Sequence, residues 1–460
     1  MELFKLRVQN LGRIKDAELS IRPLTVFVGP NNTNKTWTAY ALYGLAKRLS
    51  GGTSRFWRRP DADAVPLVHI DSQLKEVTNS KVSRIASSVA AMPADAIVQQ
   101  EVARAELIEK LAYPVRLILR GNGLAAMLAV AEDVMPLASA TIEIAQEQFS
   151  ASILSDVSFE LRKQEGIAEA AFRYTKMTGR HHVINSGIAG EIDPKFQDFL
   201  EQNVELLLLW QFYGVHVFPA ERKALVAVNN VLQASFTDLL SRPVVDFVSL
   251  LRRGRAEREY SERVLHLSDV ASLLEEKLLD GKLDFEGDAT TLTLGYACQG
   301  GPNLRMHATS SLVRALAGLD VYFKYVARPN DLIVIDEPEM NAHPEAQLMI
   351  TELLGVLVNK GINVVVTTHS PYVVDHVNNL IEAAHLPEAK RDEMASRFRL
   401  QSKEAFVPSE KVATYLFNED GSVSDILDRE TRIIDWATFG STSDDVTNLY
   451  SDILESAGQK

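Results

Sequence analysis

The stretch from Leu332 to Tyr372 constrains the fold most strongly, because two apolar runs in it are joined by a helical pattern. The first run, Leu332 to Ile335, is continuous, which is typical of a strand buried on both faces of a parallel sheet. A helix is predicted from Pro344 to Lys360, and a second buried strand is predicted from 363 to 367. The pattern therefore predicts a strand–helix–strand unit of an α/β fold.

Polar side chains follow both predicted strands, at the edge where open α/β sheets bind ligands. Asp336 and Glu337 follow the first strand, and His369 follows the second. Acids after a strand are also common as helix caps, and an isolated histidine is more often an ordinary loop residue than a catalyst. For these three residues alone, both the structural and the functional interpretations stay open.

A phosphate-binding loop is predicted near the start of the chain. A third buried-strand pattern, Thr25 to Val28, is followed by the sequence GPNNTNKT and a helical run. Backbone N–H groups of such a turn bind phosphates, the lysine meets the β- and γ-phosphates, and the threonine hydroxyl reaches Mg²⁺. The predicted nucleotide-binding residues of this loop are Gly29, Asn31, Asn32, Thr33, Asn34, Lys35 and Thr36, and Thr36 is also a predicted metal ligand.

The loop departs at one position from the usual pattern GxxxxGK[ST], because Asn34 replaces the glycine before Lys35. Asparagine is the non-glycine residue that best tolerates a positive φ, so the loop is still expected to close. The side chain of Asn34 is expected to lie close to the phosphates. Its effect on the rate of turnover stays open.

These motifs together resemble those of an ABC-class ATPase of the OLD, Rad50 and SMC-like branch, in particular ATPase subunits of bacterial anti-phage systems such as PARIS and Septu. The resemblance rests on GPNNTNKT at 29–36, LIVIDEPE at 332–339, the NAHPEAQ that follows, and TTHSPY at 367–372. It implies a P-loop NTPase head of ABC type, with a mixed, mostly parallel sheet and flanking helices. It also implies that ATP and Mg²⁺ are bound and that ATP is hydrolysed.

The resemblance implies a role for each polar residue after the two strands. Asp336 would hold Mg²⁺ through water, Glu337 would be the general base for the attacking water, and His369 would contact the γ-phosphate. Asn341 and His343 would lie in the D-loop of the family. The predicted catalytic residues are therefore Glu337 and His369, and the predicted metal ligands are Thr36 and Asp336.

Such ATPases also need a signature motif from a second subunit. The candidate is Ser310 with Ser311, at the start of a predicted helix that runs from 312 to 325. If the resemblance holds, these serines and the helix N-terminus would meet the γ-phosphate of the partner's ATP. The glycine expected after the serines is Leu312, so a plain helix cap stays an alternative.

Four segments are expected along the chain. Residues 94–165 have a strongly helical pattern, interrupted at Pro114 and Pro136, and predict a large, mainly helical insertion in the α/β head. The short turn Pro219–Arg222 resembles an element that this ATPase family has at the junction of its two lobes. A structural ion pair is an equally good explanation of the charged residues in the turn. The expected segments are the first part of the ATPase head at 1–50, the insertion at 51–200, the second part of the head at 201–385 and a small C-terminal cap at 386–460.

Composition limits the compartment and the partners. Cys298 is the only cysteine, and no apolar run reaches the roughly 18 residues of a membrane helix, so a reducing cytoplasm and no membrane contact are expected. The beginning, Met1 to Lys5, lacks a signal-peptide pattern. The net charge of −13 disfavours nucleic acid as a partner without excluding it, because binding to duplex DNA usually needs a basic face.

The expected function is an ATP-hydrolysing sensor and scaffold subunit of an anti-phage complex. Its expected partners are a second copy of itself, in an ATP-bridged dimer or higher homo-oligomer, and a separate effector such as a nuclease or toxin. The effector is expected on another chain because the residues after the switch region contain no Asp-x-Asp pair at a strand end. Two alternatives stay open: a RecF- or SMC-like ATPase that clamps nucleic acid, and a nucleotide-binding structural subunit that barely hydrolyses.

Overall fold

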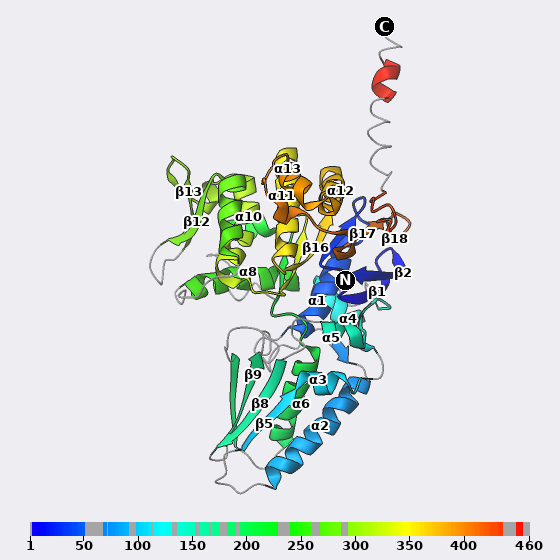
Figure 1. Ribbon diagram of the computed structural model, residues 1–460, viewed down its shortest axis with the longest axis vertical. Coiled ribbons are helices and arrows are strands. Elements are labelled where there is room, and N and C mark those ends of the chain that lie inside the picture. Colours follow the sequence, from blue (N-terminus) through cyan, green and yellow to red (C-terminus); the bar gives the residue numbers. More distant parts are fainter. Residues whose placement is uncertain are drawn as a thin grey trace.

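Figure 1 shows a computed structural model of the chain. It describes residues 2–50, 68–70, 72–91, 98–111, 114–130, 136–151, 157–164, 167–174, 182–189, 194–228, 240–258, 267–286, 293–435 and 448–453. No helix within these ranges combines the length and the apolar character that crossing a membrane requires.

A six-stranded, mostly parallel sheet forms the centre of the head, with the strand order β11-β15-β16-β3-β17-β18. All neighbouring strands in it are parallel except the last pair, β17 and β18. The three strands predicted from apolar runs are confirmed, and each is buried along its whole length. The strands are β3 (Leu24–Val28), β11 (Val215–Phe218), β15 (Leu332–Asp336), β16 (Asn363–Thr368), β17 (Val412–Phe417) and β18 (Val423–Asp425).

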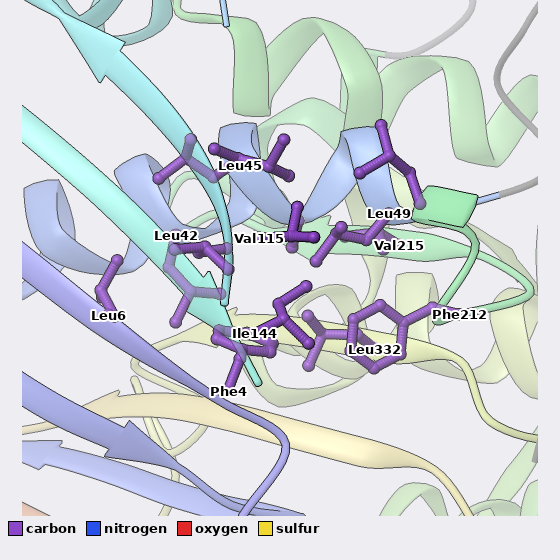
Figure 2. Packing of buried hydrophobic residues seen from close by; sticks show 14 of the residues in the cluster. Phe4, Leu6, Leu42, Leu45, Leu49, Val115, Ile144, Phe212, Val215 and Leu332 are labelled. Carbon is purple, nitrogen blue, oxygen red and sulfur yellow. The ribbon is translucent and has the colours of Figure 1, made fainter. Parts of the chain in front are cut away.

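Two hydrophobic cores cover the two faces of this sheet. Alternate residues of β15 belong to different cores: Leu332 and Val334 to one, Ile333 and Ile335 to the other. In the first core the helix α1 (Lys35–Ala46) packs together with residues of three strands, β1 (Phe4–Leu11), β6 (Val115–Arg120) and β7 (Ser139–Ile144) (Figure 2). The continuous apolar pattern of the central strands is therefore a consequence of burial on both faces.

A second sheet packs beside α1 and has the order β2-β1-β7-β6-β4, with antiparallel pairing throughout. β1 and β2, which precede the phosphate loop in the sequence, are neighbours in this sheet. The bounds of the strands are Phe4–Leu11 for β1, Ile14–Ile21 for β2, Val68–Ile70 for β4, Val115–Arg120 for β6 and Ser139–Ile144 for β7.

The prediction that residues 94–165 are mainly helical is wrong. Strands occupy much of this range, and a four-stranded antiparallel sheet of order β10-β9-β8-β5 lies beyond the head. β6 and β7 belong to the five-stranded sheet with β1, and one face of that sheet packs on α1. Buried and more exposed residues therefore alternate along both strands. Pairing with distant strands outweighs the helical propensity of Ala and Leu here. The elements are β5 (Val98–Ala103), β8 (Val157–Gln164), β9 (Ile167–Tyr174), β10 (His182–Ala189), α2 (Ser72–Ala90), α3 (Arg104–Ile108), α4 (Gly121–Leu128), α5 (Gln146–Ala151) and α6 (Pro194–Leu209).

Helices cover the other face of the central sheet and form the second core. The helix expected after β15 is confirmed as α11, and a three-stranded antiparallel sheet, β12-β13-β14, packs beside the helices of this face. The elements are α7 (Arg222–Val228), α8 (Arg242–Arg258), α9 (Ser268–Leu274), β12 (Gly281–Glu286), β13 (Thr293–Cys298), β14 (Asn303–Arg305), α10 (Ser311–Val321), α11 (Pro344–Asn359), α12 (Pro371–His385) and α13 (Glu388–Ala395).

The expected C-terminal cap is partly a strand of the head itself. β17 lies next to the phosphate-loop strand β3, and it pairs with β18 in an antiparallel hairpin. Part of the expected terminal element, 436–447, lies outside the described residues, and 448–453 form a short helix with exposed side chains. The four expected segment boundaries stay a prediction.

A buried histidine in β11 makes stability depend on pH. His216 is 5% exposed, and its Nε2 lies 3.4 Å from Oδ2 of Asp331. Burial lowers the pKa of His216 to about 4, although the hydrogen bond to Asp331 acts to raise it. The folded chain therefore keeps His216 neutral at pH values where the unfolded chain protonates it.

We expect the free energy of unfolding to fall by roughly 1.4 kcal/mol per pH unit through this one group as the pH decreases from about 6.5 to about 4. The stability that neutral His216 provides is fully present above pH 6.5 and is lost as the pH falls toward 4. Denaturant unfolding at pH 7, 6, 5 and 4.5, compared between the wild type and His216→Gln, measures it. The variant should show a shallower decline. Equal declines in the two proteins would contradict the assignment.

Candidate nucleotide-binding site

The phosphate loop connects β3 to α1, and its shape depends on residues with positive φ. Gly29 has a φ of +145°, and a Cβ atom there would lie 2.3 Å from the carbonyl oxygen of Phe417 in β17. Asn32 and Asn34 have φ values of 63° and 67°. The prediction that Asn34 adopts a positive φ in place of glycine is therefore confirmed.

The side chain of Asn34 turns toward the β1–β2 connection. Its Oδ1 accepts a hydrogen bond of 2.9 Å from the backbone N–H of Arg13. A Cβ atom on Gly12 would lie 2.2 Å from Nδ2 of Asn34, so the glycine leaves room for the amide group. The expectation that the amide lies against the phosphates does not match this contact, and Asn34 instead ties the loop to the first sheet.

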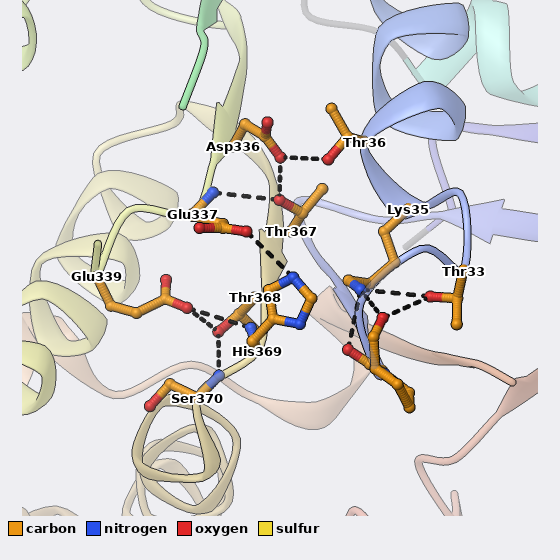
Figure 3. Close-up of polar contacts among 12 residues, drawn as sticks. Thr33, Lys35, Thr36, Asp336, Glu337, Glu339, Thr367, Thr368, His369 and Ser370 are labelled. Carbon is orange, nitrogen blue, oxygen red and sulfur yellow. Dashed lines mark hydrogen bonds and ion pairs between the residues drawn. The ribbon is translucent and has the colours of Figure 1, made fainter. Parts of the chain in front are cut away.

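Lys35 folds back over the loop (Figure 3). Its Nζ donates to the carbonyl oxygens of Gly29 at 2.9 Å and Pro30 at 2.6 Å, and lies 3.3 Å from the hydroxyl of Thr33. Burial lowers the pKa of Lys35 to about 8. The ammonium group contacts only neutral oxygens in these bonds, so an anionic group in the loop would supply the missing countercharge, which fits a phosphate.

The two predicted metal ligands lie side by side, although 300 residues separate them in sequence. Oγ1 of Thr36 lies 3.0 Å from Oδ1 of Asp336, and the hydroxyl of Tyr40 donates to Oδ2 of Asp336 at 3.2 Å. Thr367 also donates to the Asp336 carboxylate, and burial raises the pKa of Asp336. A hydroxyl beside a carboxylate is a ligand set that Mg²⁺ uses together with water and phosphate oxygens.

The side chains of Glu337 and His369 contact each other beside these ligands. Oε1 of Glu337 lies 3.1 Å from Nε2 of His369, and both side chains are partly exposed. The hydrogen bond from His369 lowers the pKa of Glu337, so the carboxylate is ionised at neutral pH. Glu337 has a φ of 47°, and its N–H lies 3.1 Å from both the carbonyl and the hydroxyl oxygen of Thr367.

A third acid, which the sequence reasoning did not single out, fixes the turn after β16. Glu339 is buried, and its Oε1 accepts from the hydroxyl of Thr368 at 2.6 Å and from the N–H of His369 at 3.2 Å. Ser370 then caps α12 by accepting from the N–H of Val373. Glu339 therefore holds the backbone of His369, and its place two residues after Glu337 in LIVIDEPE is the sequence signal that could have identified it.

The predicted signature serines lie at the start of α10. Ser310 is the N-cap and accepts from the N–H of Val313 at 3.2 Å, and Ser311 is the first residue of the helix. Within the described part of one chain, the hydrogen bonds of these serines do not reach the phosphate loop. The cap role of Ser310 is confirmed, and a role toward a partner's nucleotide stays a prediction.

The turn after β11 contains Arg222, to which the sequence alone assigned no chemical role. Arg222 is 1% exposed, and all four of its hydrogen bonds run to backbone carbonyl oxygens, not to the carboxylate of an ion pair. Two of these carbonyls belong to Asp336 and Glu337. The neighbouring Lys223 donates to Oδ1 of Asn341, at 3.1 Å, in the predicted D-loop.

His343, the second predicted D-loop residue, is the N-cap of α11, where its Nδ1 accepts from the N–H of Glu345 at 3.4 Å. Asn341 has a φ of 64°, which asparagine tolerates better than most residues. The loop from Asp336 to His343 therefore consists of local turns, tied to the β11–α7 turn by Arg222 and Lys223.

Comparison with known families and structures gives one domain match and several distant structural neighbours. Residues 250–374 match the model of an AAA ATPase domain. Comparison with curated proteins gives no match. The fold is that of a P-loop ATPase head, and the candidate phosphate loop lies between β3 and α1.

Similar solved structures include three SMC head domains. One is an SMC head bound to the C-terminal winged-helix domain of ScpA, with 11% identity, a TM-score of 0.35 and coverage of 93% of this chain and 98% of that chain. The SMC head of Thermotoga maritima has 12% identity, a TM-score of 0.27 and coverage of 82% and 92%. An SMC head with an extended coiled coil, bound to the C-terminal domain of ScpA derived from Pyrococcus furiosus, has 10% identity, a TM-score of 0.33 and coverage of 93% and 96%.

We expect Asn34→Gly to keep nucleotide affinity within about twofold and to lower the free energy of unfolding by about 1 kcal/mol, because it keeps the positive φ and loses the bond to Arg13. Asn34→Ala is the matched control, since it loses the same bond and also strains the backbone. Denaturant unfolding and calorimetric titration with ATP measure both quantities. A tenfold change in ATP affinity in Asn34→Gly would show that the amide contacts the nucleotide.

We expect Lys35→Ala to weaken ATP binding at least tenfold, because it removes the ammonium group from the phosphate loop. Lys15→Ala, at an exposed position of β2, is the control and should bind as the wild type does. Calorimetric titration with ATP measures the dissociation constants. Unchanged affinity in Lys35→Ala would contradict the assignment of the loop.

Proposed function

We propose that this protein binds and hydrolyses ATP as an ABC-class ATPase head. The observation that supports it most strongly is the convergence of Thr36, Asp336 and the Glu337–His369 pair at the carboxyl ends of three neighbouring strands. Lys35 and the turn N–H groups would bind the phosphates. Thr36 and Asp336 would hold Mg²⁺, which neutralises charge on the β- and γ-phosphates when bound.

Glu337 is the proposed general base. Its ionised carboxylate would accept a proton from the water that attacks the γ-phosphorus, which releases ADP and phosphate. His369, at 3.1 Å from that carboxylate, would orient it and contact the γ-phosphate. Glu339 would keep His369 in place through the backbone N–H.

A second copy of the chain would complete each site. Ser310 and Ser311 at the N-terminus of α10 would meet the γ-phosphate bound by the partner, where the helix dipole favours negative charge. Association would then depend on the nucleotide, because ATP links the two subunits. The proposed assembly is an ATP-bridged homodimer or a higher homo-oligomer.

The proposed biological role is that of a nucleotide-dependent sensor and scaffold in a bacterial anti-phage complex, located in the cytoplasm. This role rests on the resemblance of the motifs and on the net charge of −13, which favours protein partners over nucleic acid. In this proposal the head comprises 1–50 and 201–385 together with the strand β17, which pairs with β3. The segment 51–200 and the C-terminal part from 386 contact a separate effector, such as a nuclease or toxin.

We expect Glu337→Gln to retain ATP, to lower the rate of hydrolysis at least a hundredfold and to accumulate as a nucleotide-bound dimer, because the amide cannot take a proton from water. Phosphate release and light scattering with ATP and Mg²⁺ measure both effects. Glu345→Gln, on the exposed first turn of α11, is the control and should behave as the wild type does. Hydrolysis by Glu337→Gln at the native rate would exclude this residue as the base.

Affinity purification of the Glu337→Gln protein from its native host, with ATP present, tests the biological role. A stoichiometric nuclease or toxin-like protein identified by mass spectrometry would support the scaffold role. Recovery of DNA without a protein partner, together with a salt-sensitive affinity for duplex DNA, would favour the nucleic-acid clamp instead. Recovery of neither would contradict a stable effector complex in the absence of a trigger.

A further inference from the structure

Arg222 connects three separate elements of the head through one guanidinium group. Its Nε donates to the carbonyl oxygen of Ala315 in α10 at 2.9 Å, and its Nη1 donates to Pro219 at the end of β11 at 3.1 Å. The same Nη1 donates to the backbone carbonyl oxygen of Asp336 at 2.6 Å, and Nη2 donates to the backbone carbonyl oxygen of Glu337 at 2.7 Å. The planar group therefore fixes the spacing between the β11 turn, α10 and the end of β15.

Burial of such a group needs an explanation, since a buried charge is unfavourable unless its hydrogen bonds are satisfied. Burial lowers the pKa of Arg222, while the charges of Asp336, Glu339 and Glu337 act to raise it. The cation thus lies among the acidic side chains of the proposed site, but its hydrogen bonds are made to the backbone. It can hold the chain in position without occupying the carboxylates that the reaction uses.

The backbone of Glu337 is held on both sides. Its N–H is bound by Thr367 of β16, and its carbonyl oxygen is bound by Arg222. Its φ of 47° is unfavourable for a residue with a side chain, so the surrounding contacts must maintain it. The direction of the Glu337 side chain follows from this backbone conformation, and Arg222 supplies one of the contacts that maintain it.

We propose that Arg222 is a positioning residue that couples helix α10 to Glu337. This inference rests on the proposed function and deepens it. α10 begins at Ser310 and Ser311, and Ala315 lies one turn further along the same helix. A displacement of α10 caused by a partner's nucleotide at its N-terminus would be passed through Arg222 to the carbonyl of Glu337. The base would then take its active position only when the second subunit is bound.

Lysine cannot replace this function, because its three donors at the end of a flexible chain do not match four carbonyls on three elements. We therefore expect Arg222→Lys to lower kcat by tenfold to a hundredfold while the dissociation constant for ATP stays within about threefold, since small misplacements of a reacting group have effects of about that size. In the Glu337→Gln background, the same substitution should cause no further loss of turnover.

The chain offers a matched control in Arg104. It is 0% exposed, its Nη2 lies 3.4 Å from the carbonyl oxygen of Leu208, and its Nε and Nη1 have no hydrogen-bond partner among the described residues. It belongs to α3, which packs against α5 and α6. Arg104→Lys should alter stability and leave kcat unchanged, as expected for a buried arginine outside the site.

The experiment measures kcat, KM and the ATP dissociation constant for the wild type, Arg222→Lys and Arg104→Lys, each alone and with Glu337→Gln. A selective fall in kcat for Arg222→Lys that disappears in the Glu337→Gln background supports the proposal. An unchanged kcat, a parallel loss of ATP affinity, or an additive loss in the double variant overturns it. Absence of hydrolysis by the wild type would instead refute the proposed function.

Folding failure is also decisive. Arg222→Gln avoids an unpaired buried charge and is the second variant if the lysine variant does not fold. It should show the same selective loss of kcat. If both variants at Arg222 fail to fold while Arg104→Lys folds, Arg222 is a purely structural residue and the proposal is overturned.

Discussion

The parallel register of β3, β16 and β15 is the constraint on which the site depends. Thr368 pairs with Val28, and Asp336 pairs with Thr367, so the ends of the three strands meet at one edge of the sheet. The phosphate loop, the acidic residues and the turn with His369 leave the sheet at this edge. A slip by one residue would turn each strand's side chains to the opposite core and separate these groups.

Charge balance is the second feature that holds the site together. Asp336, Glu337 and Glu339 lie within four residues of sequence, and the buried cations near them are Lys35 and Arg222. Lys35 and Arg222 differ in their contacts: the former covers the phosphate loop, and the latter binds the backbone behind the acids. Lys35 is thus placed to bind a phosphate, whereas Arg222 is placed to hold the protein backbone.

The central strands, the phosphate loop and the acid pair could be predicted because they depend on local signals: apolar runs, turn residues and polar groups at strand ends. The positive φ of Asn34 followed from its residue type, whereas its bond to Arg13 depends on the distant β1–β2 turn. The strands β6 and β7 were missed because pairing with β1 decides them. The role of Arg222 was missed for a similar reason: its acceptors are backbone carbonyls at Ala315 and Asp336, remote in sequence.

The central claim is that residues about 300 positions apart in the sequence form one ATP-hydrolysing site that a second subunit completes. Phosphate release from ATP by the wild-type protein, measured with Mg²⁺ over a wide range of protein concentration, tests it most directly. The account predicts release that requires Mg²⁺ and a rate per molecule that rises with concentration until the dimer is saturated. No release above that of buffer at any concentration, or a rate per molecule independent of concentration, would contradict it.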